Sequence, residues 1–525
     1  MLRDGKIWIA NTESGQPVYM LPKMANRHGL IAGATGTGKT VTLKVLAESF
    51  SEMGVPVFLA DVKGDIAGML ENGVDSENMQ ERIKRFGLAE HGFEYTKYPT
   101  TLWDVFGQNG IQVRTSISDM GPLLLGRILG LNDLQNDLLT IAFKIADDNG
   151  WYLYDTKDLK AMLNELAENN KDYAAEYGNI SKQSIGAIQR AVVALEIAGG
   201  DKFFGMPELK ITDWLTTDPN GRGMIHILDS QSLINNGTLY STFLLWMLSE
   251  LFETMPEVGD LEKPKMVFFF DEAHLLFKDT PKALLDKIEQ VVKLIRSKGV
   301  GVYFVTQNPR DIPDGVLAQL GNKIQHALHA YTPSDQKAVK AAADSFRENP
   351  AFKTADVIEA LGTGEAVASF LQEDGTPSIV EKVFILPPKS KMGGIDASVR
   401  DNAIKSSNLY STYAVAVDPE SAYEMLNKKN QDEAEAEAQA KADAAAAKQQ
   451  AKEEAAAAKA AAREAEKEAN RRKRAAKSVG TTVAGTVGRE VGKKVGKQLG
   501  GKFGQTLGGN TGAQLFRGIL NTLLK

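Results

Sequence analysis

Residues 33–40 constrain the fold of this chain more than any other segment. They read Gly-Ala-Thr-Gly-Thr-Gly-Lys-Thr and match the pattern G-x-x-x-x-G-K-[ST] at every fixed position. The apolar run GLIA precedes this loop, and VTLKVLAESFSEMG follows it with the apolar spacing of a buried helix. Backbone amides at a helix N-terminus bind phosphate in this order of strand, loop and helix. A chance glycine-rich turn would lack these two neighbours, so the segment predicts a phosphate-binding loop.

The loop has the residues that bind ATP and magnesium in such sites. The glycines let the backbone wrap around the phosphates, and Lys39 reaches the β and γ phosphates. Thr40 contributes a hydroxyl ligand for Mg²⁺. The predicted nucleotide-binding residues are Gly33, Ala34, Thr35, Gly36, Thr37, Gly38, Lys39, Thr40 and Val41.

Two acids, Asp271 and Glu272, end the apolar run KMVFFF. Ligands of open α/β sheets bind beyond the carboxyl ends of the strands, which is where this pair would lie. We expect Asp271 to hold Mg²⁺ through water and Glu272 to polarise the attacking water. By itself the pair could equally cap the next helix, but together with the loop at residues 33–40 it favours ATP hydrolysis.

Polar residues at the ends of two other predicted strands are further candidates. Gln307 ends the strand that follows the acids, where its amide could sense the γ phosphate, although an exposed loop glutamine is the alternative. Asp61 and Asp65 end the second strand in the segment DVKGD. They could touch metal-bound or attacking water, and helix capping is an equally good interpretation.

Arg296 and two histidines complete the candidate residues. Arg296 is in the last turn of the helix before the Gln307 strand, so it could either reach a neighbouring subunit's ATP or stabilise a helix C-terminus. His326 and His329 lack the acidic or cysteine neighbours of a metal site, so we interpret both as ordinary strand residues.

Repeated strand and helix patterns predict an α/β fold with a parallel, doubly wound sheet. Apolar strand-like runs occur in VPVFLAD, GMIHILDS, KMVFFFDEAH, GVGVYFVTQNP, NKIQHALHAY, GEAVASFLQED and IVEKVFILPP. The predicted organisation is a short N-terminal β segment (1–25), an ATPase core (26–65 and 221–390), a mainly helical insertion (66–220), a linker (391–430), an Ala/Glu/Lys-rich helix (431–477) and a Gly-rich basic tail (478–525).

Composition excludes several classes of protein and of site. The chain has no cysteine, which rules out disulfides, thiolate zinc sites and cysteine nucleophiles. We find no signal peptide and no apolar run of about 18 residues, so we expect a cytoplasmic protein. The net charge of −6 is uneven, because residues from 471 onward hold 12 of the 61 basic residues and one of the 67 acidic residues. An acidic body predicts that any nucleic-acid contact is local, in a pore or on the tail.

The tail repeats glycine every fourth residue from Gly488 to Gly508, each preceded by Val, Leu or Phe. On a helix this spacing makes a ridge of small residues beside an apolar stripe, which permits close contact between helices. Glycine weakens a helix in water, so the tail would need a partner helix or a membrane surface, with peripheral membrane association as one outcome. A disordered tail is the alternative. The Ala-rich helix before it is expected to be a spacer.

These residues together resemble the HerA/FtsK superfamily of ring-forming, RecA-like ATPases, and most closely the bacterial HerA-like helicase family. The resemblance spans roughly residues 1–390 and is carried by ANRHGLIAGATGTGKT, FLADVKGD, FFFDEAH, RSKGVGVYFVTQNP, LGNKIQHAL and GTGEAVASFL. It implies a RecA-like core with a helical insertion, hexameric rings, translocation of double-stranded DNA, and Arg296 acting in trans. Two departures are an N-terminal segment too short for the β-barrel of archaeal HerA, and His329 where relatives are expected to have arginine.

The leading hypothesis is therefore a cytoplasmic ATPase that forms a ring and acts on DNA as a helicase or translocase. Its predicted catalytic residues are Glu272, Lys39, Gln307 and Arg296, with Thr40 and Asp271 at the metal. The alternative is a nucleotide-gated scaffold that its tail anchors to a membrane or a protein partner. A metabolic kinase fits less well, because the long spacing between Lys39 and Asp271 suits RecA-like motors.

Overall fold

The computed structural model describes residues 1–278 and 282–476. The chain divides into two units, residues 1–430 and residues 431–525. The glycine-ridged tail predicted for 478–525 lies outside the described residues.

The first unit is built on one 13-stranded sheet whose central strands are all parallel. Nearly all residues of these strands are buried, as in a parallel sheet that is covered on both faces. The predicted α/β fold with a mainly parallel sheet is confirmed. In spatial order the parallel strands are β11 (Asn322–Gln325), β4 (Gly29–Ala32), β10 (Val300–Thr306), β9 (Met266–Phe270), β5 (Val57–Asp61), β8 (Ile225–Asp229), β6 (Thr100–Asp104) and β7 (Ile111–Gln112).

Antiparallel strands extend the sheet beyond β11. The chain's first strands join here, because Thr12 pairs with Val383. The N-terminal β segment is therefore an edge of the same sheet. The strands on this side are β12 (Glu365–Ser369), β13 (Glu381–Ile385), β2 (Lys6–Thr12), β1 (Leu2–Arg3) and β3 (Pro17–Met20).

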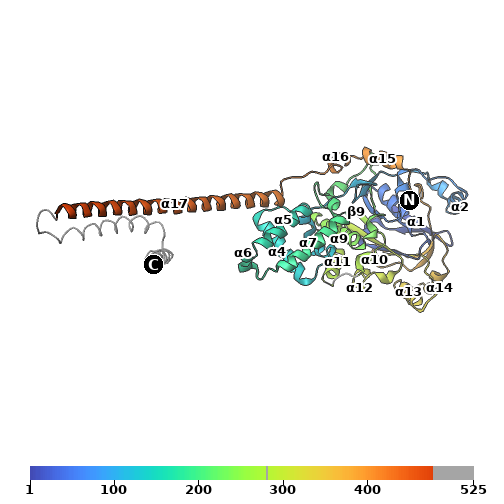
Figure 1. Cartoon of the computed structure of the whole chain (residues 1–525). Coiled ribbons are helices and arrows are strands. Elements are labelled where there is room, and N and C mark those ends of the chain that lie inside the picture. Colours follow the sequence, from blue (N-terminus) through green and yellow to red (C-terminus); the bar gives the residue numbers. More distant parts are fainter. Residues whose placement is uncertain (279–281, 477–525) are drawn as a thin grey trace. The chain divides into compact units, whose positions relative to one another are not determined.

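Helices cover both faces of the sheet, and the alternation of side chains along each strand decides which face a residue meets. Phe269 of β9 joins the core formed with α1 (Lys39–Glu52), whereas Phe268 and Phe270 join the core on the other face. Figure 1 shows α1 on one side of the sheet, with α9 and α11 between the sheet and the helices α4 to α7. The second core contains α3 (Ile117–Ile128), α9 (Gly237–Thr254) and α11 (Lys282–Ile295).

Residues 66–220, expected to be mainly helical, also contain two strands of the core sheet. Leu102 of β6 pairs with Ile227 of β8, so the segment returns to the sheet between its first helix and its second. TTLWD has only two apolar residues, Leu102 and Trp103, so no apolar run marks it as a buried parallel strand. The helices of this segment are α2 (Glu77–Arg85), α3, α4 (Asp133–Asn149), α5 (Thr156–Glu168), α6 (Asn170–Tyr177), α7 (Lys182–Ile197) and α8 (Gly200–Phe203).

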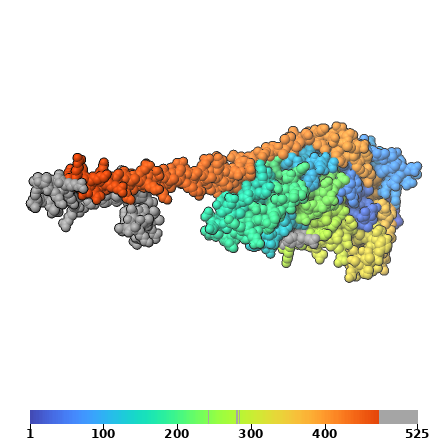
Figure 2. Space-filling model, in the orientation of Figure 1, coloured from blue at the N-terminus to red at the C-terminus, as the bar shows by residue number. Residues whose placement is uncertain are grey.

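Residues 391–430 are not a plain linker. They form α15 (Ala397–Ser406), α16 (Tyr410–Tyr413) and the start of α17 (Ala422–Ala476), which begins nine residues before the predicted helix. Figure 2 shows this segment as an orange band on the surface of the first unit. The remaining helices of that unit are α10 (His274–Phe277), α12 (Asp314–Leu317), α13 (Pro333–Asp344) and α14 (Thr354–Ala360).

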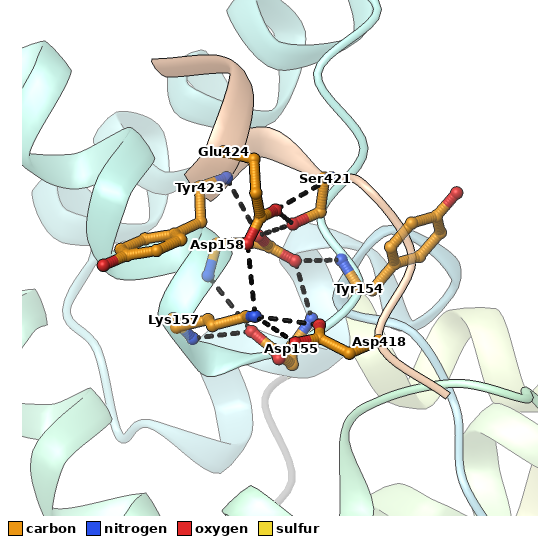
Figure 3. Close-up of polar contacts among 8 residues, drawn as sticks. All are labelled: Tyr154, Asp155, Lys157, Asp158, Asp418, Ser421, Tyr423 and Glu424. Atoms are coloured by element: carbon orange, nitrogen blue, oxygen red, sulfur yellow. Dashed lines mark hydrogen bonds and ion pairs between the residues drawn. The ribbon is translucent and has the colours of Figure 1, made fainter. Parts of the chain in front are cut away.

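The start of α17 is held on α5 by a polar network (Figure 3). The buried Asp158 carboxylate accepts hydrogen bonds from the backbone amides of Tyr154, Asp155 and Tyr423. The Ser421 hydroxyl lies 2.5 Å from an Asp158 oxygen and 2.6 Å from a Glu424 oxygen. Glu424 also accepts from the Ser421 amide, which is half of a capping box. None of the helices among the described residues is both long and apolar enough to span a membrane.

Candidate active site

The loop at residues 33–40 lies between β4 and α1, and backbone hydrogen bonds fix it from both sides. The Gly33 amide donates to the Thr306 carbonyl at the end of β10, at 3.3 Å. On the other side the Ala34 amide donates to the Ala327 carbonyl at 2.8 Å. The Gly364 amide, before β12, donates to the Thr37 carbonyl at 3.0 Å. The loop is thus preformed at the carboxyl ends of the parallel strands.

Two glycines of the loop are required by their surroundings. Gly33 has φ +154°, and a Cβ there would lie 2.5 Å from the Cβ of His326. Gly38 caps α1 with φ +117°, and its Cβ would lie 3.2 Å from the Gly364 amide nitrogen. A side chain at either position would be strained and would push against the wall of the loop.

His326 supports the loop and is not the ordinary strand residue that the sequence indicated. It follows β11, and its buried ring contacts the Thr42 hydroxyl through Nε2 at 2.8 Å and the Glu365 carbonyl through Nδ1 at 2.9 Å. Burial lowers the pKa of His326 to about 4, so the ring is neutral at pH 7. A carbonyl can only accept, so Nδ1 donates its proton to Glu365 and Nε2 accepts from Thr42. Thr42 lies 284 positions away, so sequence patterns gave no sign of this contact.

Lys39 begins α1, and its side chain folds back over the loop. Its Nζ donates to the carbonyls of Gly33 at 2.6 Å and Ala34 at 2.9 Å. Burial lowers the pKa of Lys39, as does the charge of Lys63, while the negative charges of Asp271 and Glu272 act in the opposite direction. The ammonium group therefore lies within electrostatic reach of both acids.

Asp271 and Glu272 follow β9 and therefore lie, like the loop, at the carboxyl ends of the parallel strands. This convergence follows from strand order, since β4, β10 and β9 are adjacent and parallel. The Glu272 amide donates to an Asp271 carboxylate oxygen at 2.9 Å. Burial, reinforced by the negative charge of Glu272, raises the pKa of Asp271 to about 7. A cation beside this carboxylate would stabilise its charged form.

The Glu272 carboxylate is buried and meets two polar neighbours. Its Oε2 accepts from the Gln307 side-chain amide at 3.3 Å, and His274 Nδ1 lies 3.3 Å from the same oxygen. Glu272 has φ +47°, an unusual conformation for a residue with a side chain. The structure brings together the predicted Lys39, Asp271, Glu272 and Gln307. His274 was not predicted, although it stands in the same FFFDEAH segment.

Asp61 is occupied by its own turn. Its carboxylate accepts from the backbone amides of Gly64 at 2.7 Å, Asp65 at 3.2 Å and Ile66 at 3.0 Å. Burial raises its pKa. Of the two interpretations that the sequence left open, this geometry favours capping of the turn after β5.

Arg296 lies away from this site. It begins the short 3₁₀ helix Arg296–Lys298, and its charge helps lower the pKa of His28, which burial mainly brings to about 4. His28 precedes β4, whereas the loop follows β4. Arg296 therefore lies at the amino-terminal ends of the parallel strands, and the loop lies at their carboxyl ends. A cavity of about 320 Å³ lies here, and its basic lining residues are Arg27, Lys293, Arg296 and Lys323.

The residues at the loop have the oxygen ligands and phosphate-binding groups that magnesium and a nucleoside triphosphate require. The Thr40 hydroxyl and the Asp271 carboxylate supply oxygen atoms, the ligands that Mg²⁺ prefers, and phosphate oxygens and water complete such a shell. Among residues 1–278 and 282–476 no group of three or more acidic or histidine side chains is placed to hold a metal alone.

Comparison with known proteins identifies relatives of this arrangement. The sequence model of the family described as Helicase HerA-like C-terminal matches residues 6–511. The DNA double-strand break repair helicase HerA of Sulfurisphaera tokodaii is 25% identical over 381 residues, 70% of this chain and 66% of the relative. The protein of the same name from Sulfolobus acidocaldarius is 24% identical over 370 residues, with the same coverage. The chain thus spans 66% of the length of each of these relatives.

Two solved structures were also found to be similar to this chain. VirB4 of Thermoanaerobacter pseudethanolicus has a TM-score of 0.49 at 16% identity. The match covers 73% of this chain and 97% of the VirB4 chain. The plasmid coupling protein TrwB, in complex with ADP and Mg²⁺, has a TM-score of 0.48 at 17% identity, covering 74% of this chain and 90% of its own.

Proposed function

Because this chain belongs to the Helicase HerA-like C-terminal family, we propose that it hydrolyses MgATP and couples hydrolysis to movement on DNA. One observation carries the hydrolytic part of the proposal. The ends of β4, β9 and β10 bring Lys39, the Asp271–Glu272 pair and Gln307 to one edge of the sheet, and Glu272 and Gln307 are in contact at 3.3 Å.

The residues divide the work of phosphoryl transfer among themselves. Lys39 exchanges its bonds to the Gly33 and Ala34 carbonyls for the β and γ phosphates, which the loop amides also bind. Mg²⁺, held by Thr40 and Asp271, would neutralise charge that develops on the phosphates. Glu272 orients and polarises the attacking water. Gln307, which touches Glu272, senses loss of the γ phosphate at the end of β10.

Arg296 is assigned to a neighbouring subunit's site. It lies at the edge of the sheet opposite its own loop, with the whole of β4 between them, so it is badly placed for its own γ phosphate. In a ring, for which we propose six subunits, the face of one subunit that carries Arg296 would lie against the next subunit's loop. An arginine supplied in this way stabilises the charge of the transition state.

DNA is the proposed substrate of the movement. The support is that two relatives, each about a quarter identical, are named as DNA double-strand break repair helicases. The body of the chain is acidic, so the contact with DNA is expected to be local, as in the pore of a ring.

The test is the steady-state ATPase rate of the full chain with and without double-stranded DNA, together with its mass in solution with nucleotide. The proposal predicts a large oligomer whose rate rises several-fold with DNA and falls back when salt screens the phosphate contacts. A rate indifferent to DNA would contradict the motor and favour the scaffold that the tail anchors to a membrane or protein.

A further inference from the structure

A second cavity shares a wall with the phosphate loop. It has a volume of about 180 Å³ and lies between α2 and the start of β12, beside β13. We call it the α2 pocket. The residues that line it include Arg82, Arg85, Gly364 and Phe384, together with the carboxylates Glu81 and Glu365.

Gly364 is the wall that the α2 pocket and the loop have in common. Its amide donates to the Thr37 carbonyl at 3.0 Å, and Gly38 approaches it so closely that a Cβ on Gly38 would lie 3.2 Å from the same nitrogen. From the other side, an Arg82 guanidinium nitrogen lies 2.8 Å from where a Cβ on Gly364 would be. Arg82 is thus separated from the loop by one glycine.

Sheet order places the α2 pocket at the correct end of a bound nucleotide. Glu272 and Gln307 come from β9 and β10 on one side of β4, so the γ phosphate points to that side. The α2 pocket lies on the opposite side of β4, beyond β11, where Glu365 pairs with Phe384 at the same edge of the sheet. The base is at the far end of a nucleotide from its γ phosphate, so it extends toward this pocket.

The α2 pocket offers a flat cationic surface and an unpaired charge. The Arg85 guanidinium lies 3.7 Å from the centre of the Phe384 ring, which supports it from below. Arg82 donates to the Asn78 side chain at 3.1 Å and to the Ile385 carbonyl at 3.5 Å, and neither arginine forms an ion pair with a carboxylate among the described residues. The nearby Glu365 is already engaged by Lys382 at 3.4 Å and the Gly362 amide at 3.0 Å. Planar guanidinium groups stack on aromatic rings, and their free N–H groups bind hydroxyl and phosphate oxygens.

We propose that the α2 pocket receives the base and ribose of the nucleotide whose phosphates the loop holds. The base stacks on the Arg85 guanidinium that Phe384 supports, and Arg82 faces the ribose and the α phosphate. This inference rests on the proposed nucleotide site and adds the residues that bind its non-reacting part.

The experiment compares two ligands that share the loop but not the pocket. ADP and inorganic pyrophosphate are titrated into the full chain by calorimetry, with Arg85→Ala, Arg85→Lys and the matched control Lys84→Ala, an exposed charge on the same helix. Arg85→Ala should weaken ADP about tenfold and leave pyrophosphate within about twofold, because stacking is lost and the loop is untouched. Arg85→Lys keeps the positive charge but lacks the planar guanidinium on which a base can stack. It should therefore lose most of the ADP affinity that Arg85→Ala loses.

Two results would overturn the inference, and they differ from failure of the proposed function. Unchanged ADP affinity in Arg85→Ala, or an equal loss for ADP and pyrophosphate, would show that the base does not use this pocket. Wild-type protein that binds neither ligand, or a Lys39→Ala variant that binds both normally, would instead refute the nucleotide site itself and this inference with it.

Discussion

Glu272 combines a buried carboxylate with a strained backbone. Its φ of +47° costs a residue with a side chain about 1–3 kcal/mol, so neighbouring contacts must hold it. The Ala273 amide donates to the Val305 carbonyl at 2.9 Å, and the Tyr240 hydroxyl donates to the Asp271 carbonyl at 2.8 Å. These bonds on either side of the turn direct the Glu272 carboxylate to Gln307. Backbone strain of this kind clusters at active sites.

His326 links the stability of the chain to pH. Its pKa of about 4 in the folded chain lies below the ordinary value of 6.5, so the unfolded chain takes up a proton first as the pH falls. The contribution of His326 is therefore complete above pH 6.5 and is lost between pH 6.5 and 4, on the order of 3 kcal/mol at most. His326→Asn should destabilise the protein at pH 7 and make its free energy of unfolding less dependent on pH over this range.

Urea unfolding at pH 7 and pH 5 measures this difference. The control is His329→Asn, which removes an exposed histidine close by in the sequence. His28 and His226 are also buried, with pKa values lowered by burial to about 4 and about 3, so His326→Asn should reduce the pH dependence without abolishing it. A variant with the same pH dependence as wild type would contradict the neutral, buried role of His326.

Among the site residues, the sequence predicted those that a contiguous motif or the end of a strand determines. Lys39 follows from the loop pattern, and Glu272 and Gln307 follow from their places after adjacent parallel strands; their roles stay predictions. His326 and Arg85 were missed because their partners are distant in sequence. Thr42 is 284 positions from His326, and Phe384 is nearly 300 positions from Arg85.

Among the helices, α17 depends on Ser421, which joins its start to α5. Its single hydroxyl proton can point to only one carboxylate at a time, Asp158 at 2.5 Å or Glu424 at 2.6 Å. Ser421→Ala removes a donor from the fully buried Asp158 and should lower the free energy of unfolding by about 1–3 kcal/mol. Hydrogen exchange of residues 421–429 should speed up more than exchange in β9, because α17 loses its local anchor.

Ser411→Ala is the matched control, since it removes an exposed hydroxyl in α16 of the same segment. Its unfolding free energy should stay within about 0.5 kcal/mol of wild type. If Ser421→Ala were equally silent, the network in Figure 3 would not anchor α17.

Long apolar runs between helical patterns were predicted as strands, and β5, β8, β9 and β10 lie within them. β6 and the true start of α17 were not predicted. The five residues of β6 carry no readable period, and the start of α17 was placed too late although Ser421-Ala-Tyr-Glu424 has the S-x-x-E signal of a helix N-terminus. Pairing in the sheet determines β6, and tertiary contacts with α5 reinforce the start of α17.

Seen across the whole sheet, Arg296 and the phosphate loop lie at opposite ends of the parallel strands. The role in trans that we propose for Arg296 predicts that Arg296→Ala abolishes most hydrolysis while leaving ATP binding intact. Mixing Arg296→Ala with Glu272→Gln should restore part of the lost ATPase rate. In mixed rings some intact Glu272 sites then face an intact Arg296 of the other variant.

The control mixes Glu272→Gln with Lys39→Ala. Both substitutions damage the same part of the site within one subunit, so mixing them should give no rate beyond that of either variant. If Arg296→Ala alone kept the wild-type rate but unfolded more easily, the arginine would only stabilise the end of its helix.

ATP binding and hydrolysis by Glu272→Gln, measured beside wild type in magnesium, test the proposed hydrolytic site most directly. The variant should bind ATP as tightly as wild type and hydrolyse it at least about a hundredfold more slowly, because the loop is intact and the water-polarising carboxylate is gone. Hydrolysis by Glu272→Gln at the wild-type rate, or wild-type protein that binds ATP without hydrolysing it, would contradict the proposal that this chain is an ATPase with Glu272 at its catalytic centre.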